Sequence, residues 1–421
     1  MAHPGPCAGA PRERAGGGSR VSGTRHRVCV LTGSRAEYGL LAPVLDELAR
    51  RPALEVRLLV TGTHLSVRHG LTEREILADG RMIDARVDLD LDDDSRLGVA
   101  RALGGAVTRL AEALALLEPD VLVVLGDRWE VLAAAQAALV LRIPVAHLHG
   151  GELTAGAFDD AIRHAVTKMS HLHFVAAPEY ARRVVAMGEA PERVVVTGAL
   201  GVDLARATPA VSRERLAAEV GIRLGVPLVC LTHHPTTLVD GPPSREIAEV
   251  LAALETLEAW HPGTTTVCTG TNADPAGREV GEALRAWVAA APARRALHAS
   301  LGRARYTALV RLADVVVGNS SSGIIEAPVL GTPSVNVGPR QDGRLRAASV
   351  REAACERGAI ADAIRAALAE SRRDAWPSPY DGGGGAAARI AEVLERWLTD
   401  GSLRGARKEF HDATPHAGGV A

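Results

Sequence analysis

Short apolar runs alternate along the chain with longer amphipathic segments. The clearest case starts at VLVVL (121–125), an unbroken apolar run between Pro119 and Gly126. Such a run is typical of a strand that is buried on both faces of a sheet. The Ala- and Leu-rich segment 131–142 predicts a helix, and a second strand is expected from Ile143 to Ala146. The pattern predicts a strand–helix–strand unit.

The same alternation recurs on both sides of this unit. Further strands are expected at 27–32, 56–62, within 81–94, and at 171–177, 193–203, 226–237 and 264–275, with two more within 313–344. Helices are expected at 38–50, 99–117, 178–188, 244–260, 355–372 and 384–399. Strands that are each followed by a helix favour an α/β fold with parallel, doubly wound sheets.

The length of 421 residues favours two domains rather than one core. We predict a disordered tail over 1–25, an N-terminal Rossmann-like domain over 26–205 and a C-terminal Rossmann-like domain over 206–380. The boundary is placed near 200–215, where periodicity is lost. A helix within 381–400 could cross back to the first domain, and 401–421 is expected to be frayed.

Composition narrows the class of protein. A net charge of −2, from 48 basic and 50 acidic residues, argues against a broad nucleic-acid surface. The five cysteines include no Cys-x-x-Cys pair, so neither a disulfide framework nor a zinc site is expected. No apolar run approaches membrane-spanning length, and the first 25 residues lack the apolar core of a signal peptide. We therefore expect a cytoplasmic protein.

Polar residues follow two successive strands of the central unit. Asp127 and Arg128 come directly after the first strand, and His149 and Glu152 follow the second. Ligands of open parallel sheets collect at the carboxyl ends of strands, so we expect the active site there. Asp159 and Asp160 begin the next helix; the competing interpretation is that they only favour the helix dipole and form ion pairs four residues apart.

A second candidate site lies in the other half. GNSSSG (318–323) follows the buried run VVV and precedes an apolar helix, so its hydroxyls and backbone N–H groups suit a diphosphate. A helix cap without a ligand is the competing interpretation. Glu326 could accept hydrogen bonds from both ribose hydroxyls. The turn at 33–37 is a weaker candidate for a phosphate site. His64, a single histidine after the second strand, is interpreted as a structural residue rather than a functional one.

Three segments carry a family resemblance: TGSRAEYGLL, GDRWE and HLHGGELTAGAFDDAIRHAVTKMSHLHF. They resemble the hydrolysing UDP-N-acetylglucosamine 2-epimerases of sialic acid biosynthesis, over about residues 27 to 390. The resemblance implies two Rossmann-like domains facing across a cleft, as in GT-B glycosyltransferases. It implies release of UDP with formation of a glycal, followed by hydration to free N-acetylmannosamine.

The resemblance also implies roles for individual residues. For the nucleotide it implies contacts from Arg35, Ala36, Arg128, His234, Asn272, Ser320, Ser321, Glu326 and Arg340. For catalysis it implies Asp127, Asp159 and His234, with either Glu152 or His149 as a further acid or base. We lean to Glu152, because a carboxylate preserves the chemistry where some relatives carry Glu at the position of His149. Asp159 is preferred over Asp160. No metal or other cofactor is expected.

Other functions stay open at this point. The rivals are a non-hydrolysing 2-epimerase, a GT-B glycosyltransferase and a nucleotide-sugar-binding protein without turnover. The sugar is also open, because similar enzymes of the legionaminic acid route act on diacetamido sugars and the nucleotide could be GDP. The expected partner is a nucleotide sugar, with no nucleic acid and no membrane. A homo-oligomer, dimer or tetramer, is expected, with the helix at 99–117 as one possible surface.

Overall fold

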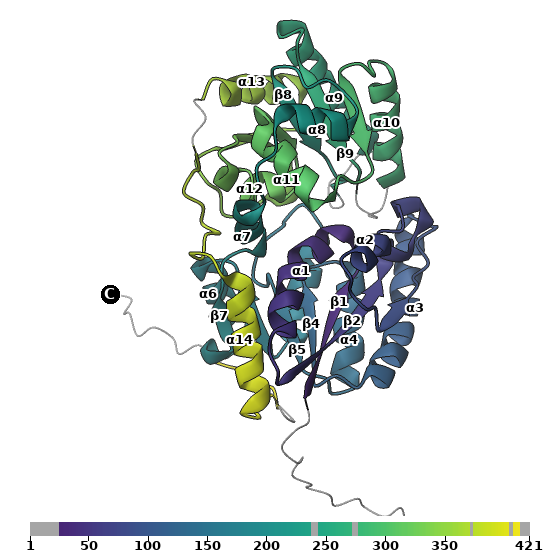
Figure 1. Ribbon diagram of the computed structural model, residues 1–421, viewed down its shortest axis with the longest axis vertical. Helices are drawn as coiled ribbons and strands as arrows, with labels where there is room; N and C mark the ends of the chain where they lie inside the picture. Colours follow the sequence, from purple (N-terminus) through teal and green to yellow (C-terminus); the bar gives the residue numbers. More distant parts are fainter. Residues whose placement is uncertain (1–24, 237–242, 272–276, 371–373, 404–406, 413–421) are drawn as a thin grey trace, which may run out of the picture.

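Two parallel sheets, each covered by helices on both faces, make up the structure, a computed structural model that describes residues 25–236, 243–271, 277–370, 374–403 and 407–412 (Figure 1). The first sheet has seven strands in the order β3-β2-β1-β4-β5-β6-β7, and the second has six in the order β10-β9-β8-β11-β12-β13. In both sheets the first strand lies inside the sheet and the order reverses beside it. The predicted α/β, doubly wound fold is confirmed.

The strands are short and mostly buried. Those of the first sheet are β1 (His26–Thr32), β2 (Leu54–Thr61), β3 (Ala85–Val87), β4 (Val121–Leu125), β5 (Val145–Leu148), β6 (Leu172–Val175) and β7 (Val194–Val196). Those of the second are β8 (Leu228–Thr232), β9 (Thr265–Thr269), β10 (Arg295–His298), β11 (Val315–Gly318), β12 (Ser334–Val337) and β13 (Val350–Ala353).

Helices connect the strands and cover the sheets. Those of the first half are α1 (Arg35–Ala49), α2 (Glu73–Ala78), α3 (Arg96–Leu117), α4 (Trp129–Val140), α5 (Asp159–Met169), α6 (Pro178–Ala186) and α7 (Leu200–Ala207). Those that follow are α8 (Arg213–Val220), α9 (Pro243–Trp260), α10 (Gly277–Ala289), α11 (Gly302–Leu312), α12 (Ser322–Ile325), α13 (Arg357–Leu368) and α14 (Ala386–Thr399).

Strand β4 shows why an all-apolar run forms a central strand. Val121 and Val123 belong to the core on one face of the first sheet, where they pack with residues of α1 and α14. Leu122 and Val124 belong to the core on the other face, with residues of α3 and α4. Successive side chains of a strand point to opposite faces, so every position of this strand must be apolar.

Helix α14 returns from the second half and lies along the first sheet (Figure 1). Its buried residues Ile390, Leu394 and Leu398 share a core with Leu41 and Leu45 of α1. The ion pair between Arg51 and Glu395, 2.5 Å apart, lies beside this contact. The chain therefore ends its last long helix on the domain where it began.

Three regions differ from the sequence-based expectation. The stretch 200–215 contains α7 and the start of α8 instead of aperiodic chain, because both helices bury small or aliphatic side chains such as Val202, Ala205 and Leu216. Strand β10 and helices α10 and α11 were not predicted. Residues 407–412, expected to be frayed, are attached: Lys408 donates to the carbonyls of Lys168 and Ser170.

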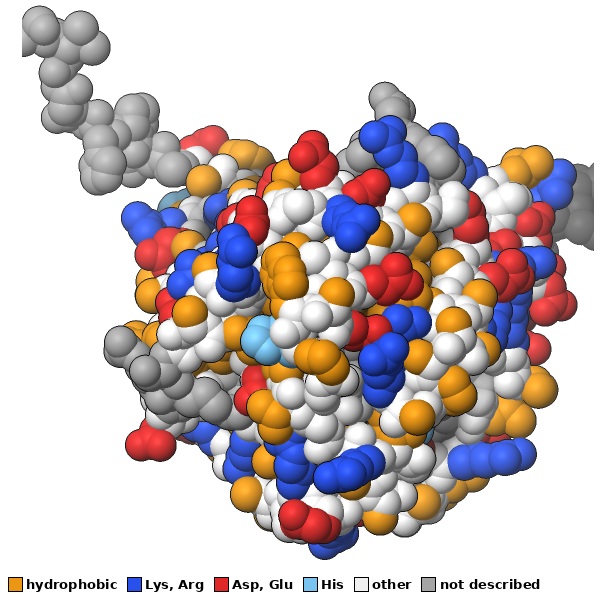
Figure 2. Space-filling view, turned by 90° about the horizontal axis from the view of Figure 1, so that it is seen from above, with side chains coloured by type: hydrophobic (Ala, Val, Ile, Leu, Met, Phe, Trp, Pro, Cys, Tyr) orange, Lys and Arg blue, Asp and Glu red, His pale blue; other side chains and the backbone are white. Residues whose placement is uncertain are grey.

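The surface carries mixed charge. In the view onto the end of the second half, basic and acidic side chains are interspersed with single apolar ones (Figure 2). Over the described ranges, no helix has both the length and the apolar composition to cross a bilayer. In the same residues, no cluster of three or more His, Cys, Asp or Glu side chains is arranged to hold a metal ion.

Candidate active site between the two sheets

A cleft of about 1020 Å³ lies between the two halves, at the carboxyl ends of β1, β4, β8 and β11. Ligands of doubly wound sheets bind at these strand ends, where the order of strands reverses. Several arginines line the cleft and give it the positive charge that a diphosphate requires: Arg35, Arg68, Arg128, Arg278, Arg285 and Arg303.

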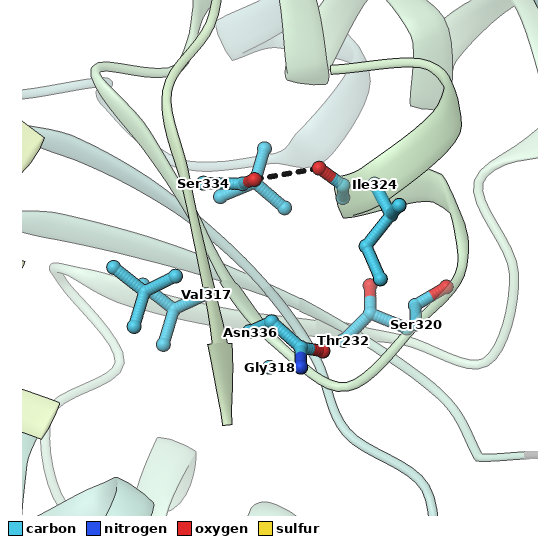
Figure 3. A pocket seen from close by; sticks show the side chains of 10 residues that line it. Thr232, Val317, Gly318, Ser320, Ile324, Ser334 and Asn336 are labelled. Carbon is cyan, nitrogen blue, oxygen red and sulfur yellow. Dashed lines mark hydrogen bonds between the residues drawn. The ribbon is translucent and has the colours of Figure 1, made fainter. Parts of the chain in front are cut away.

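The serine turn after β11 forms one wall of the cleft. Ser320, Ser321 and Ser322 line it, together with Glu326 just beyond α12. Behind the turn lies a small cavity of about 10 Å³, and Ser334 on β12 donates a 2.6 Å hydrogen bond to the carbonyl of Gly323 (Figure 3). The back of the turn is thus fixed, while its hydroxyl groups face the cleft.

Asn319 holds this turn against the loop that follows β8. Its side-chain oxygen accepts from the backbone N–H of His234 at 2.7 Å, and its amide nitrogen donates to the carbonyl of the same residue at 2.8 Å. Asn319 is fully buried, so these two hydrogen bonds hold the loop and the turn together. His234 lines the cleft, whereas His233 is buried and faces Glu246 at 3.7 Å.

Glu326, which directly follows the C-terminal end of α12, lies close to the basic side chain of Arg303. Its carboxylate lies 3.8 Å from the guanidinium of Arg303, and both residues line the cleft. Burial raises the pKa of Glu326, and the arginine opposes this effect. A carboxylate in this position can accept hydrogen bonds from a diol such as ribose.

The turn after β1 forms the opposite wall. Ser34 caps α1 by accepting from the N–H of Glu37, and the Glu37 carboxylate accepts from the N–H of Gly33 at 2.7 Å. The first hydrogen bond caps α1, and the second ties Glu37 to the residue before the cap, so the turn is fixed at the start of the helix. Arg35 and Ala36 line the cleft, and Arg35 also pairs with Glu75 at 2.9 Å.

A second carboxylate, Glu130, is buried close to Glu37. Burial, followed by the charge of Glu130, raises the pKa of Glu37 to about 8. Two buried carboxylates near one cleft hold at least one proton at neutral pH, because their charges repel. Neither residue was selected from the sequence.

Asp127 stands at the end of β4 and lines the cleft. Its carboxylate forms an ion pair with Arg163 of α5, which also donates to the carbonyl of Glu152 and to the hydroxyl of Thr154, both at 2.9 Å. Behind it, His147 hydrogen bonds to the carbonyl of Gly126 at 2.8 Å and fixes the turn. Asp127 is thus fixed at the edge of the cleft by its pair with Arg163.

Glu152 and His149 form a buried pair beyond Asp127. The Nδ1 atom of His149 lies 3.0 Å from Oε1 of Glu152, and the other oxygen of Glu152 pairs with Arg344 of the second half. The positive charges of Arg344 and His149 lower the pKa of Glu152 despite the cost of burial. A carboxylate held charged in this way is a poor proton donor at neutral pH.

His149 itself has an unusual backbone. Its φ of 65° lies in the left-handed region that non-glycine residues seldom adopt. Such strain is characteristic of functional sites. Its Nε2 is buried and has no hydrogen-bond partner among the described residues.

The two aspartates at the start of α5 have different surroundings. Asp160 accepts a 2.5 Å hydrogen bond from the N–H of Thr154 and lies 3.6 Å from His164, so it fixes the preceding loop. Asp159 is buried, with 4% of its surface exposed. This difference favours Asp159 over Asp160 for chemistry, and the assignment stays a prediction.

The nucleotide candidate Arg340 is not among the residues that line the cleft. Arg340 is buried and donates to the carbonyl of Asn319 at 3.3 Å, so it supports the serine turn from behind. Asn272 lies outside the described residues. Like Arg340, the residues Glu152, His149 and Asp159 are not among those that line the cleft, and they lie behind its first-half wall.

Arg163 was not expected as a partner of Asp127, and Arg344 was not selected from the sequence. Asn319 was included in the candidate turn 318–323, but without a role of its own. The spacing of Asp159 and Arg163 suggested a pair within the helix, whereas the structure directs Arg163 to Asp127, 36 residues away. The pair of Arg344 and Glu152 spans 192 residues. No local pattern reveals contacts of this separation.

The fold and the site place the chain among two-domain proteins that act on nucleotide sugars. Its residues 46–395 match the family described as UDP-N-acetylglucosamine 2-epimerase, and the chain belongs to this family.

Among the similar proteins is a Campylobacter jejuni protein named GDP/UDP-N,N'-diacetylbacillosamine 2-epimerase (hydrolyzing). It is 35% identical over 327 residues, 78% of this chain and 84% of that protein. A Legionella pneumophila protein named UDP-N,N'-diacetylbacillosamine 2-epimerase (hydrolyzing) is 35% identical over 343 residues, 81% of this chain and 89% of that protein. The crystal structure of Methanocaldococcus jannaschii UDP-GlcNAc 2-epimerase in complex with UDP-GlcNAc and UDP superposes with a TM-score of 0.73 at 17% identity. The match covers 88% of this chain and 99% of that one, and it confirms the two-domain fold.

Proposed function

We propose that the protein is a hydrolysing 2-epimerase that converts a nucleoside-diphosphate 2-acetamido sugar into the free, C2-inverted sugar and the nucleoside diphosphate. The observation that carries this proposal is the pairing of two unlike walls across one cleft. The serine turn and the arginines suit a diphosphate, and Asp127 faces them from the first sheet. Relatives named as hydrolysing 2-epimerases at 35% identity support it.

The first stage is an elimination. A base takes the proton from C2, the electrons form a C1–C2 double bond, and the C1–O bond breaks with departure of UDP. This step needs a positioned base and stabilisation of the leaving diphosphate. We assign the base to the first-half wall, with Asp127 as the leading candidate and Asp159 as the second. Ser320, Ser321, Arg35, Ala36 and Arg128 would contact the nucleotide, with Glu326 on the ribose, Arg340 behind the turn and His234 beside the pyrophosphate.

The second stage is hydration of the glycal. Water supplies hydroxyl to C1 and a proton is delivered to C2 on the opposite face, so that one water is consumed for each UDP released. We assign the second acid or base to His149, whose Nε2 is unoccupied while Nδ1 faces Glu152. This changes the preference for Glu152 drawn from the sequence, because the charge of Arg344 and the contact with His149 lower the pKa of Glu152.

The proposal extends to substrate and setting. The candidate substrates are UDP-N-acetylglucosamine and UDP- or GDP-N,N'-diacetylbacillosamine, the latter from the names of the relatives. The product would be a precursor of the sialic acid or legionaminic acid type. We also propose that the protein is cytoplasmic and forms a homo-oligomer. Light scattering of the purified protein tests the oligomeric state.

Phosphorus and proton NMR of the purified protein with each candidate sugar nucleotide tests the proposal. We expect stoichiometric release of free nucleoside diphosphate together with one free epimerised sugar. A nucleotide sugar epimerised at C2 with the diphosphate still attached would establish the non-hydrolysing reaction instead. Turnover only in the presence of an added acceptor would establish a glycosyltransferase.

A further inference from the structure

Two loops that are far apart in the sequence meet directly where the halves join. The loop 149–157 after β5 carries His149 and Glu152, and the loop 338–346 after β12 carries Arg340 and Arg344. Gly156 lies so close to the second loop that a Cβ atom there would stand 2.6 Å from the Cα of Arg340. The N–H of Ala155 donates to the carbonyl of Asp342 at 3.1 Å. The first loop therefore takes its shape partly from the second.

The centre of this junction is a buried ion pair. Arg344 pairs with Glu152, and the exposed fractions of their side chains are 7% and 2%. Arg344 also approaches the hydroxyl of Thr154 at 3.5 Å. An unpaired charge at this depth is strongly unfavourable, so each residue requires the other.

Tyrosines hold the backbone beside Arg344 in place. The hydroxyl of Tyr180, on α6, accepts from the N–H of Leu345 at 3.2 Å, and the hydroxyl of Tyr380 donates to the Leu345 carbonyl at 3.0 Å. The two hydroxyls are 2.8 Å apart. Leu345, the neighbour of Arg344 in the chain, is thus fixed by tyrosines from two distant segments.

The same loop reaches the nucleotide wall. Gln341 donates to the carbonyl of Asn319 at 2.8 Å, and Arg340 donates to the same oxygen at 3.3 Å. Asn319 in turn holds the backbone of His234 beside the serine turn. One short loop therefore touches both the nucleotide wall and, through Glu152, His149.

We propose that Arg344 is a positioning residue for catalysis: it holds Glu152 across the domain junction, and Glu152 in turn orients His149 with Nδ1 engaged and Nε2 free for proton transfer. This rests on the proposed function. The acid–base group of the first half is competent only while the nucleotide-binding loop of the second half is docked on it. The loop 338–346 also supports the serine turn. Through the ion pair of Arg344 and Glu152, the position of this loop determines the orientation of His149.

The charged groups around His149 determine whether each substitution strengthens or weakens proton binding by its imidazole. Glu152 is its anionic neighbour at 3.0 Å, with Arg344 and Arg163 beyond it. His147 and, from the second half, Glu326 also lie within electrostatic reach. Removing the negative charge of Glu152 must weaken proton binding by His149, and removing the positive charge of Arg344 must strengthen it.

The test uses Arg344→Met, Glu152→Gln and the double variant, with Arg351→Met as control. Arg351 lies on β13, outside the loop, and pairs with Glu370 at 2.6 Å at the surface, so its loss should leave kcat within about threefold. We expect kcat of each test variant to fall by about 100-fold or more, the lower end of the range for general acid–base groups. UDP affinity should change by less than about threefold, because neither side chain lines the cleft.

The double variant separates positioning from folding. Replacing both members of a buried ion pair is often neutral for stability. We therefore expect the double variant to melt near the wild-type temperature and still lack activity. Recovery of activity in the double variant would overturn the proposal and leave only a structural bridge.

Titration of His149 by imidazole NMR, assigned with His149→Gln, gives a result that does not depend on turnover. The pKa of His149 should fall in Glu152→Gln and rise in Arg344→Met. An unchanged pKa in both variants would overturn the proposal. If the wild type releases no nucleotide from any sugar, the proposed function fails, and the titration still decides whether Arg344 and Glu152 position His149.

Discussion

The two walls of the cleft are built from different chemistry. The first-half wall carries Asp127 at the end of β4, where it pairs with Arg163, and the buried pair of Glu152 with Arg344 lies behind this wall. The second-half wall carries a turn of neutral hydroxyls fixed by Asn319 and Ser334, with charged residues such as Arg303 and Glu326 beside it. Charged groups that titrate are suited to move protons, whereas fixed neutral donors bind a phosphate without titrating near neutral pH. The difference indicates a division between reaction and binding.

Asp127→Asn should give the largest effect. Asparagine keeps the shape but cannot accept a proton, so kcat should fall by about 1,000-fold or more, within the usual range for a general base. UDP affinity, measured by calorimetry, should stay within about fivefold, since the serine wall is intact. Asp120→Asn, at the opposite end of β4, is the control. A kcat within tenfold of wild type would place the base elsewhere, with Asp159 next in order.

Ser320→Ala combined with Ser321→Ala should mainly weaken UDP binding rather than lower kcat. Loss of a hydrogen bond to a charged phosphate costs about 1.5–3 kcal/mol, so loss of both should lower UDP affinity by at least about 100-fold. KM should rise by a larger factor than the factor by which kcat falls. Ser349→Ala, a buried serine away from the cleft, should leave both unchanged. A loss confined to kcat would contradict the assignment of binding to this wall.

A smaller effect is expected on stability. Burial lowers the pKa of His147 to about 3 from 6.5, and its hydrogen bond to Gly126 fixes the turn before Asp127. Between pH 6.5 and 3 the unfolded chain binds the additional proton, so this contribution to folding is present above pH 6.5 and is lost as pH falls. The slope is at most about 1.4 kcal/mol per pH unit.

Urea unfolding at pH 7.5 and pH 5 measures this dependence. His147→Gln should be less stable than wild type at pH 7.5, and its stability should fall less on going to pH 5. His261→Gln, an exposed histidine of the second half, should keep the wild-type dependence. Equal pH dependence in wild type and His147→Gln would show that His147 is not held neutral.

Features that depend on neighbouring residues were predictable from the sequence. The run 121–125 is apolar at every position because both faces of β4 are covered, and Asp127 follows it wherever the strand ends. The serine turn after β11 is likewise a local signal. Helix α7 was missed, because it is only eight residues long and its buried face includes the small residues Gly201 and Ala205.

Features that depend on distant contacts were not predictable. Nothing around Arg344 indicates that it meets Glu152 in the other half, and nothing around Lys408 indicates that it binds the end of α5. The preference for Glu152 over His149 failed to anticipate this partner. A carboxylate is a suitable base in isolation, and its pKa falls only when the second half supplies a cation.

The central claim is that the first-half wall exchanges the C2 proton while the second-half wall releases the diphosphate. The most direct measurement is proton NMR of the wild-type protein turning over its sugar nucleotide in D₂O. The account predicts one deuterium at C2 of the free epimerised sugar and one free nucleoside diphosphate for each turnover. Free sugar that retains hydrogen at C2 would contradict it, because the diphosphate would then leave by simple hydrolysis, without proton chemistry at that carbon.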